Sequence, residues 1–208
     1  KIGNILILEI SSFQLEFINQ FRPKIGVFLN ISPDHLDRHE NMSEYIKMKL
    51  KMVINCKEND SIIFNEDDDT LNSIFSIQNA NTIPYSLKNK TKYFSVNKTK
   101  IYDENDEVFC SLNEISLKGR HNLSNLIASA TVAKMMKVDD QIIKNTMKNF
   151  IGIKHRLQEI RNINGVSYIN DSKATNIDSV IVAINSFNRP MILILGGKNK
   201  NSNFQLLL

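Results

Sequence analysis

The chain has 208 residues, enough for one or two domains with hydrophobic cores, and its hydrophobic content of 42% excludes a disordered protein. Its 26 basic and 22 acidic side chains leave a net charge of +4 and are interspersed, so no basic patch with interleaved aromatic residues predicts a nucleic-acid partner. The small positive excess fits either an anionic substrate or a lysine-rich composition, and the sequence alone favours the second interpretation.

Cysteine usage and hydropathy indicate the compartment. Cys56 and Cys110 lie far apart and form no Cys-x-x-Cys pair, as is typical of a reducing, cytoplasmic environment. No apolar run reaches the roughly 20 residues that span a bilayer, and no signal peptide is recognised. We therefore expect a cytoplasmic protein without a membrane partner.

The first part of the chain alternates short apolar runs with helical patterns. In chain order the expected elements are a strand over 4–9, a helix over 13–21, a strand over 25–30, a helix beginning near 43, a strand over 61–64 and a helix over 70–77. The apolar runs have the length of buried strands, and Ser11 and Ser12 are suitable caps for the first helix. This alternation predicts a largely parallel sheet with right-handed crossovers.

Polar side chains follow these strands. Glu9 closes the first strand, where a buried carboxylate requires a cation or hydrogen-bond donors, and the amides of the next helix explain it equally well. His35 comes just after the second strand, and Lys49 shares a helical face with Tyr45. Because ligands bind outside the carboxyl ends of strands in open α/β sheets, we expect chemistry at His35.

Three consecutive aspartates, Asp67, Asp68 and Asp69, resemble a metal cluster only superficially. Consecutive side chains point in different directions, so a solvated helix start is the better interpretation. From Thr82 to Leu117 the pattern changes to short β runs separated by turn residues. This change predicts an antiparallel β excursion attached to the α/β unit.

A strong helical pattern over 122–136 follows Gly119 and carries Asn122 and Asn125 on one face near its beginning. A side-chain amide both donates and accepts hydrogen bonds, as recognition of an adenine edge requires. Helix capping explains Asn122 without any ligand.

The last part of the chain repeats the alternation of strands and helices. In chain order the expected elements are a helix over 139–150, a hairpin of 157–162 and 165–169 around Asn164-Gly165, a helix over 177–186 and a strand over 191–195. Because a helix ends at Gly152 and a new series of strands follows, we place a domain boundary there. The expected domains are residues 1–152 and 153–208.

Short motifs in a fixed order resemble the Mur ligase family. They are EISSFQLE (9–16), NISPDHLDRH (30–39), YIKMKLK (45–51), GRHNLSN (119–125), HR (155–156), NDSKATN (170–176) and LGGKNK (195–200). The resemblance implies an α/β fold with a mostly parallel sheet flanked by helices, a small antiparallel β excursion and part of a Rossmann-like C-terminal domain. Residues 1–152 would then be the central ATP-binding domain, and 153–208 the C-terminal domain.

The resemblance also implies ATP-dependent amide-bond formation. The 170–176 loop is similar to that of members that add D-glutamate to UDP-N-acetylmuramoyl-L-alanine through an acyl phosphate in peptidoglycan synthesis. Phosphoryl transfer depends on positioning and charge neutralisation, and Mg²⁺ prefers oxygen ligands such as a carboxylate. We expect ATP, two Mg²⁺ sites, these two substrates and a monomeric enzyme.

The roles of individual residues follow from the same resemblance. The expected magnesium and catalytic residues are Glu9, His35 and Lys49, the last as a carbamate formed with carbon dioxide. The expected ATP contacts are Asn122 and Asn125 at the adenine, Asp171 at the ribose, and Arg156 and Lys173 at the phosphates. The expected substrate contacts are His35, Thr175 and Lys200. Without the resemblance, Lys200 would be interpreted as an exposed loop lysine.

One departure from the family pattern is the absence of a glycine-rich loop that ends in Gly-Lys-Ser or Gly-Lys-Thr. We therefore expect a fragment that lacks this P-loop, an N-terminal domain and the end of the C-terminal domain, and that is inactive alone. Two alternatives remain: another member of the superfamily, such as a folylpolyglutamate synthase, or a non-catalytic nucleotide-binding module. Retention of Glu9, His35 and Lys49 together argues against the second.

Overall fold

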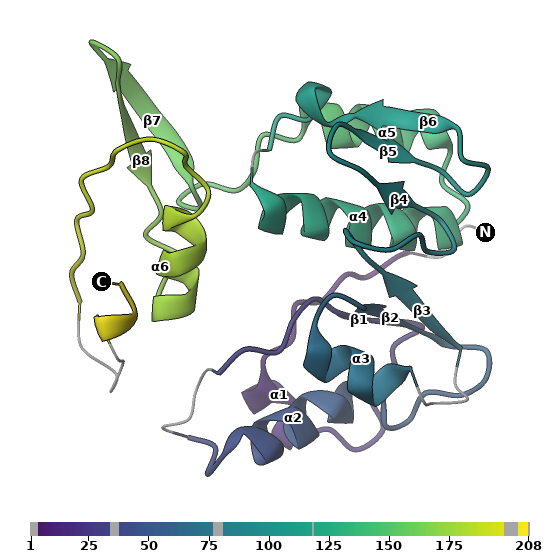
Figure 1. Cartoon of the computed structure of the whole chain (residues 1–208). Helices are drawn as coiled ribbons and strands as arrows, with labels where there is room; N and C mark the ends of the chain where they lie inside the picture. The colour runs from purple at the N-terminus through teal and green to yellow at the C-terminus, as the bar shows by residue number, and fades with distance from the viewer. Residues whose placement is uncertain (1–3, 34–37, 77–80, 118, 198–203, 208) are drawn as a thin grey trace. The chain divides into compact units, whose positions relative to one another are not determined.

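The computed structural model describes residues 4–33, 38–76, 81–117, 119–197 and 204–207 (Figure 1). The chain forms two compact units. The first contains residues 1–64 and 68–83, and the second contains 65–67 and 84–208. The expected domain boundary at 152–153 lies inside the second unit and stays a prediction.

The first unit is built on parallel strands. Its elements are α1 (Ser12–Glu16), β1 (Ile25–Phe28), α2 (Met42–Leu50), η1 (Lys51–Val53), β2 (Ser61–Asn65) and α3 (Asp69–Phe75). Strands β1 and β2 run parallel, with Ile25 opposite Ser61 and Phe28 opposite Phe64. The sheet order is β1-β2-β3, where β3 is Thr82–Tyr85. The predicted parallel pairing is therefore confirmed for β1 and β2, and the right-handed crossover stays a prediction.

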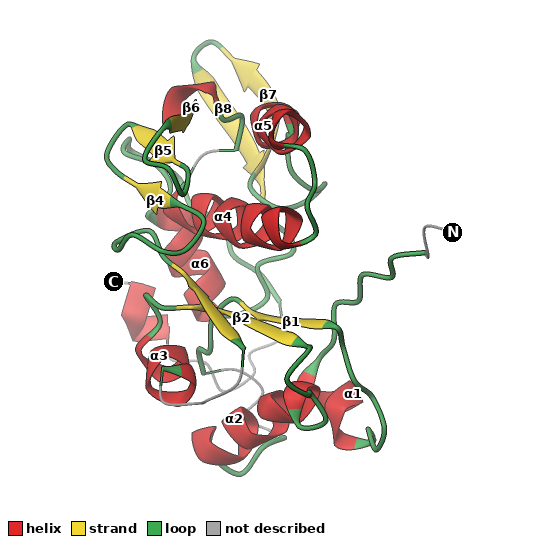
Figure 2. Ribbon diagram, turned by 90° about the vertical axis from the view of Figure 1, so that its right-hand side faces the viewer, coloured by secondary structure: helices red, strands yellow, loops and turns green. Residues whose placement is uncertain are grey.

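Aromatic side chains form the core between this sheet and its helices. Phe75 of α3 lies 5.0 Å from Phe28 and 5.4 Å from Phe64, measured between ring centroids. Tyr45 of α2 and Leu71 of α3 belong to the same buried cluster. Figure 2 shows α2 and α3 on the same side of β1 and β2, as this packing requires.

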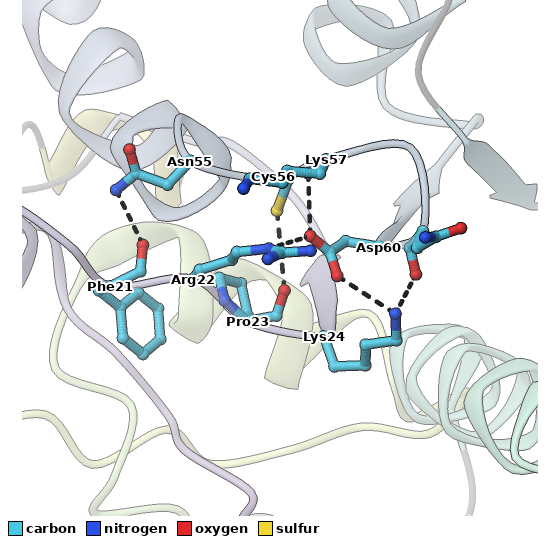
Figure 3. Close-up of polar contacts among 9 residues, drawn as sticks. Phe21, Arg22, Pro23, Lys24, Asn55, Cys56, Lys57 and Asp60 are labelled. Carbon is cyan, nitrogen blue, oxygen red and sulfur yellow. Dashed lines mark hydrogen bonds and ion pairs between the residues drawn. The ribbon is translucent and has the colours of Figure 1, made fainter.

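An ionic cluster joins the beginnings of β1 and β2 (Figure 3). The side chain of Asp60 is only 2% exposed and accepts hydrogen bonds from Arg22 Nε at 2.5 Å and from the Lys57 amide at 2.9 Å. Lys24 Nζ lies 3.3 Å from the other carboxylate oxygen and also donates to the Asn59 carbonyl. The Arg22 guanidinium, followed by the Lys57 amide, holds the pKa of the Asp60 carboxyl far below its usual range.

Two further contacts lie beside this ionic cluster. Asn55 Nδ2 donates to the Phe21 carbonyl at 3.0 Å, and Cys56 Sγ lies 3.8 Å from the Pro23 carbonyl oxygen (Figure 3). Burial raises the pKa of the Cys56 thiol. The thiol therefore stays protonated near neutral pH and acts as a small apolar group rather than a nucleophile.

The second unit contains two antiparallel sheets and three α-helices among its described residues. Its elements are β4 (Ser95–Val96), β5 (Lys100–Tyr102), β6 (Val108–Ser111), η2 (Leu112–Glu114), α4 (Arg120–Met135), α5 (Asp140–Asn149), β7 (Gln158–Ile163), β8 (Val166–Asn170), α6 (Ile177–Ile184) and η3 (Phe204–Leu207). Strands β4, β5 and β6 form one sheet, and β7 and β8 pair as a hairpin. The predicted antiparallel excursion and the hairpin around Asn164-Gly165 are confirmed.

Side chains of two helices cover the β4-β5-β6 sheet. The Phe109 ring of β6 packs edge-on against Phe94 at 5.1 Å and lies 4.7 Å from Lys144 Nζ of α5. Lys134 Nζ of α4 lies 5.8 Å from the same ring. Such cation–π contacts use the long lysine side chains as apolar cover for the aromatic ring.

Three sequence-based expectations about strands are wrong. Residues 4–9 and 191–195 are not strands, and their apolar side chains are exposed, Ile7 by 89% and Ile192 by 94%. A strand needs a partner for its amide and carbonyl groups, and no described strand pairs with either run. Residues 82–85, expected in the antiparallel excursion, instead form β3 of the first sheet. No helix in the described part of the chain has the length and apolar character of a membrane span.

Candidate active site

A pocket in the first unit brings together two of the predicted site residues. Glu9 and Lys49 line it, with Ile10, Ser11, Ser12, Gln14 and Tyr45, and its volume is about 380 Å³. Glu9 itself is exposed rather than buried at a strand end, because residues 4–9 form no strand. Ser11, and not Glu9, caps the helix that follows.

Reciprocal capping positions the α1 side of the pocket. The Gln14 amide donates to Ser11 Oγ at 3.3 Å, while the Ser11 amide donates to Gln14 Oε1 at 2.9 Å. This capping box fixes the turn that leads from Glu9 into α1. It explains why Ser11 and Gln14 line the same pocket as Glu9.

Helix α2 supplies Lys49 to the pocket. Asn41 caps α2 by accepting a hydrogen bond from the Glu44 amide at 3.0 Å. Tyr45 and Lys49 are one turn apart, and Lys49 Nζ lies 5.2 Å from the centroid of the Tyr45 ring. The predicted shared face of Tyr45 and Lys49 is therefore confirmed.

A buried histidine, His39, contacts residues of both α1 and α2 that line the pocket. His39 is 2% exposed, and its Nε2 lies 3.1 Å from Ser12 Oγ, which is also buried. Its ring stacks on Phe13 with an interplanar angle of 7° and lies 5.3 Å from the ring of Tyr45. His39 thus links α1 to α2, a role that we did not predict although the residue ends one of the quoted motifs.

Two of the predicted residues, His35 and Lys200, lie outside the described residues. Among those that are described, no group of three or more histidine, cysteine, aspartate or glutamate side chains could hold a metal ion. The three consecutive aspartates do not form such a group. Asp68 caps α3 through the Leu71 amide, and Asp67 accepts hydrogen bonds from Ser86 and Leu87, which confirms the predicted helix start.

Helix α4 carries Asn122 and Asn125, both half-buried, in its first turns. Its N-cap is Gly119, at φ 98°, so the capping explanation for Asn122 is wrong. Burial lowers the pKa of the adjacent His121, while Asp171 raises it and Arg156 lowers it. The imidazole is therefore mostly neutral near pH 7.

The ends of the β7-β8 hairpin bring a second group together. Leu157 donates its amide proton to Asp171 Oδ1 at 3.0 Å, and the Lys173 amide donates to the His155 carbonyl at 3.1 Å. These bonds hold residues 155–157 against residues 171–173. Thus the predicted Arg156, Asp171 and Lys173 lie on two joined loops, with the exposed Thr175 just before α6.

These features define an α/β protein whose polar side chains gather in loops and at helix starts. Solved Mur ligase structures share this fold. MurF from Acinetobacter baumannii aligns with a TM-score of 0.68 and 15% identity, over 85% of this chain and 40% of that chain. UDP-N-acetylmuramoyl-L-alanyl-D-glutamate--2,6-diaminopimelate ligase aligns with a TM-score of 0.62 and 24% identity, over 85% and 38% of the two chains.

Sequence comparisons identify the family. The family model described as Mur ligase middle domain matches residues 2–133. UDP-N-acetylmuramoylalanine--D-glutamate ligase of Clostridioides difficile is 42% identical over 208 residues, or 99% of this chain and 46% of that protein. The same-named ligase of Pelotomaculum thermopropionicum is 40% identical over 97% and 45%. The chain belongs to the Mur ligase family, and it spans about half the length of these curated relatives.

Proposed function

We propose that the protein containing this chain is an ATP-dependent ligase that joins D-glutamate to UDP-N-acetylmuramoyl-L-alanine in peptidoglycan synthesis. The observation that carries this proposal is the identity of 42%, across 99% of this chain, with a relative named UDP-N-acetylmuramoylalanine--D-glutamate ligase. The position of Arg156, Asp171 and Lys173 on joined loops supports it, because one nucleotide could engage the two cations through its phosphates and the carboxylate through its ribose hydroxyls.

ATP would bind through residues of the second unit. The side-chain amides of Asn122 and Asn125 suit the adenine edge, and the carboxylate of Asp171 suits the ribose hydroxyls. Arg156 and Lys173 are both exposed cations that suit the phosphates. A solved MurF from Thermotoga maritima in complex with ADP shares the fold, with a TM-score of 0.62 and 16% identity.

Magnesium fits the donor set of the pocket in the first unit. Glu9 offers an exposed carboxylate, which is the ligand type that this ion prefers, whereas the side-chain oxygens of Ser11 and Gln14 are engaged in the capping box and Ser12 Oγ lies against His39. An unmodified Lys49 ammonium would repel the ion, whereas a carbamate would add an anionic oxygen donor. Bound magnesium would neutralise charge on the transferred phosphoryl group. We assign Glu9, His35 and carbamylated Lys49 as its ligands.

The protein's own residues would mainly orient and shield the reactants. Phosphoryl transfer from ATP to the UDP-N-acetylmuramoyl-L-alanine carboxylate yields an acyl phosphate and ADP. The amine of D-glutamate, held by Thr175 and Lys200, then attacks the acyl carbon and displaces phosphate. Positioning and charge stabilisation account for most of the rate in phosphoryl transfer. Exclusion of water protects the acyl phosphate from hydrolysis.

An amino-acid panel tests the proposed substrate. The protein is incubated with ATP, Mg²⁺, UDP-N-acetylmuramoyl-L-alanine and individual amino acids, and release of phosphate and formation of the new amide are measured. D-glutamate should give the highest kcat/KM. A clear preference for another amino acid would assign the protein to a different member of the superfamily, and nucleotide binding without turnover would indicate a binding module.

A lysine pair on α2 tests the carbamate. Lys49→Ala should abolish turnover, while Lys47→Ala, on an exposed lysine of the same helix, should leave it unchanged. Intact-protein mass spectra in bicarbonate should contain a carbamate increment in the wild type and in Lys47→Ala but not in Lys49→Ala. Full activity of Lys49→Ala without any increment would contradict the assignment.

We also propose that the protein acts in the cytoplasm as a monomer, with its domain boundary at residues 152–153. Both cysteines are free, which suits a reducing compartment. Light scattering during size-exclusion chromatography tests the monomer. Limited proteolysis tests the boundary, because cleavage should be concentrated around Gly152.

A further inference from the structure

Arg156 lies between two residues with left-handed backbone conformation. The φ angle is 67° at His155 and 44° at Leu157. Residues other than glycine seldom adopt such angles because Cβ crowds the backbone, and a bulky residue such as leucine does so less often than histidine. Two such residues, one on each side of Arg156, require a surrounding structure that holds them in place.

Backbone and side-chain hydrogen bonds supply that support. The loop containing Asp171 and Lys173 accepts one bond from Leu157 and donates one to His155, at 3.0 and 3.1 Å. The His155 amide also donates to Gln158 Oε1 at 2.8 Å. Each neighbour of Arg156 is therefore tied to the loop that carries Asp171 and Lys173.

Asn170 completes the connection between the two loops. Its Nδ2 lies 3.1 Å from His155 Nδ1, and its Oδ1 accepts a hydrogen bond from the Ser172 amide at 3.0 Å. A donating amide requires a lone pair on Nδ1, so the imidazole is the tautomer protonated on Nε2. One side chain thus bonds both loops at the end of β8.

We infer that the His155–Asn170 pair is a clasp that holds the Arg156 loop in its strained conformation and thereby positions Arg156 and Lys173 for the phosphates of ATP. The inference rests on the proposed function. His155 and Asn170 are positioning residues: they set the direction of the two cations without contacting the nucleotide. A loop ordered before binding loses less conformational entropy when ATP binds, which raises affinity.

Three variants distinguish the effect of the His155–Asn170 hydrogen bond from the effect of the left-handed backbone at residue 155. His155→Gly removes the imidazole but favours the left-handed conformation. His155→Asn retains both features, since asparagine tolerates this conformation and its amide oxygen accepts a hydrogen bond from Asn170. Asn164→Gly is the matched control, because Asn164 is left-handed at φ 49° in the turn between β7 and β8 and has no part in the clasp.

Amide hydrogen exchange and calorimetry with ATP and adenosine provide the measurements. In His155→Gly, the Leu157 and Lys173 amides should exchange faster, and ATP affinity should fall by about tenfold, as expected for one lost hydrogen bond. Adenosine affinity should not change, because adenosine has no phosphates. His155→Asn and Asn164→Gly should match the wild type in each measurement.

The outcomes that contradict the clasp differ from those that contradict the proposed function. Unchanged amide exchange in His155→Gly would overturn the clasp whether or not ATP binds. Equal losses for ATP and adenosine would also overturn it, since they indicate a general effect on folding. Normal protection of the two amides in a wild-type protein that binds no ATP would overturn the proposed function instead, together with the phosphate role of the clasp.

Discussion

Arg22 and Asp60 are 38 positions apart in the sequence, yet the Arg22 Nε lies 2.5 Å from a carboxylate oxygen of Asp60. Arg22 precedes β1 and Asp60 directly precedes β2, and the Ser61 amide donates to the Lys24 carbonyl beside them at 3.1 Å. The ion pair therefore fixes the point at which the two parallel strands begin to pair. This relationship makes Asp60 a determinant of strand register.

Replacing Asp60 with asparagine should lower the melting temperature at neutral pH. The Arg22 guanidinium, which is 38% exposed, would lose its anionic partner, and the Lys57 amide would lose the charged acceptor that it now has in the buried Asp60 side chain. Because the pKa of Asp60 is held below its ordinary value of 3.8, the stabilisation is present above that pH and declines as the pH falls below it. The wild type and Asp60→Asn should therefore converge only in strong acid, as thermal melts at several pH values would test.

The Lys90–Asp106 pair provides the control for this experiment. Its charged atoms are 2.6 Å apart, but the two side chains are 54% and 65% exposed. Exposed pairs contribute little, so Asp106→Asn should barely change the melting temperature. Equal losses in Asp60→Asn and Asp106→Asn would show that burial of the Asp60 side chain has no consequence for stability.

A double-mutant cycle on Ser12 and His39 should reveal a coupling of about 1 kcal/mol in the free energy of unfolding. Ser12→Ala leaves the buried His39 Nε2 without its partner at 3.1 Å, while His39→Phe keeps a ring between Phe13 and Tyr45. Once His39 is replaced, loss of the Ser12 hydroxyl should cost less. Urea unfolding of the four proteins measures the coupling, and strictly additive effects would count against a hydrogen bond between these residues.

The strands show how far an apolar run predicts structure. The runs in β1 and β2 are apolar, and both form strands because each has a neighbour to pair with. Residues 4–9 and 191–195 have the same pattern but remain irregular and exposed. A run of apolar residues indicates that the segment tends to be buried. Strand formation also requires a second strand to pair with, and no local pattern identifies that strand.

Local sequence signals likewise predicted only part of the candidate site. Turn and helix signals correctly placed Tyr45 and Lys49 on one helical face. The contact of His39 with Ser12 spans 27 positions, and neither residue carries a local signal of that pairing. The left-handed conformation of Leu157 was equally hidden, because leucine is an unfavourable choice there and only the tertiary hydrogen bonds explain it.

Thr131→Val should stabilise the protein. Thr131 is 1% exposed in α4, and its hydroxyl has no hydrogen-bond partner among the described residues. Valine has nearly the same shape and removes the unsatisfied group, so the free energy of unfolding should rise by up to about 1 kcal/mol. The melting temperature should increase by at most about 2–4 °C.

Thr131→Ser is the complementary variant. It keeps the hydroxyl but removes a buried methyl group, so it should lower the free energy of unfolding by about 1 kcal/mol. Calorimetric melts compare the two variants directly. A valine variant less stable than the wild type would mean that the hydroxyl contributes to stability.

Protonation of His121 should lower the free energy of unfolding as the pH falls below neutral. Burial, the largest cause, and Arg156 lower its pKa from the ordinary value of 6.5, while Asp171 opposes them. The unfolded chain therefore binds a proton at a higher pH than the folded chain, so stability is fully present above 6.5 and is lost as pH falls through the lower folded value. His121→Gln, which cannot titrate, should weaken this dependence.

Ser186→Ala distinguishes burial from hydrogen bonding as the cause of the lowered pKa of His121. Ser186 Oγ lies 3.5 Å from His121 Nδ1, and its main bond is to the Val182 carbonyl at 2.7 Å. Because burial is the principal cause of the lowered pKa, Ser186→Ala should retain the wild-type pH dependence. Melting temperatures from about pH 8 to about pH 5 provide the comparison. A His121→Gln profile as steep as that of the wild type would assign the acid sensitivity to other groups.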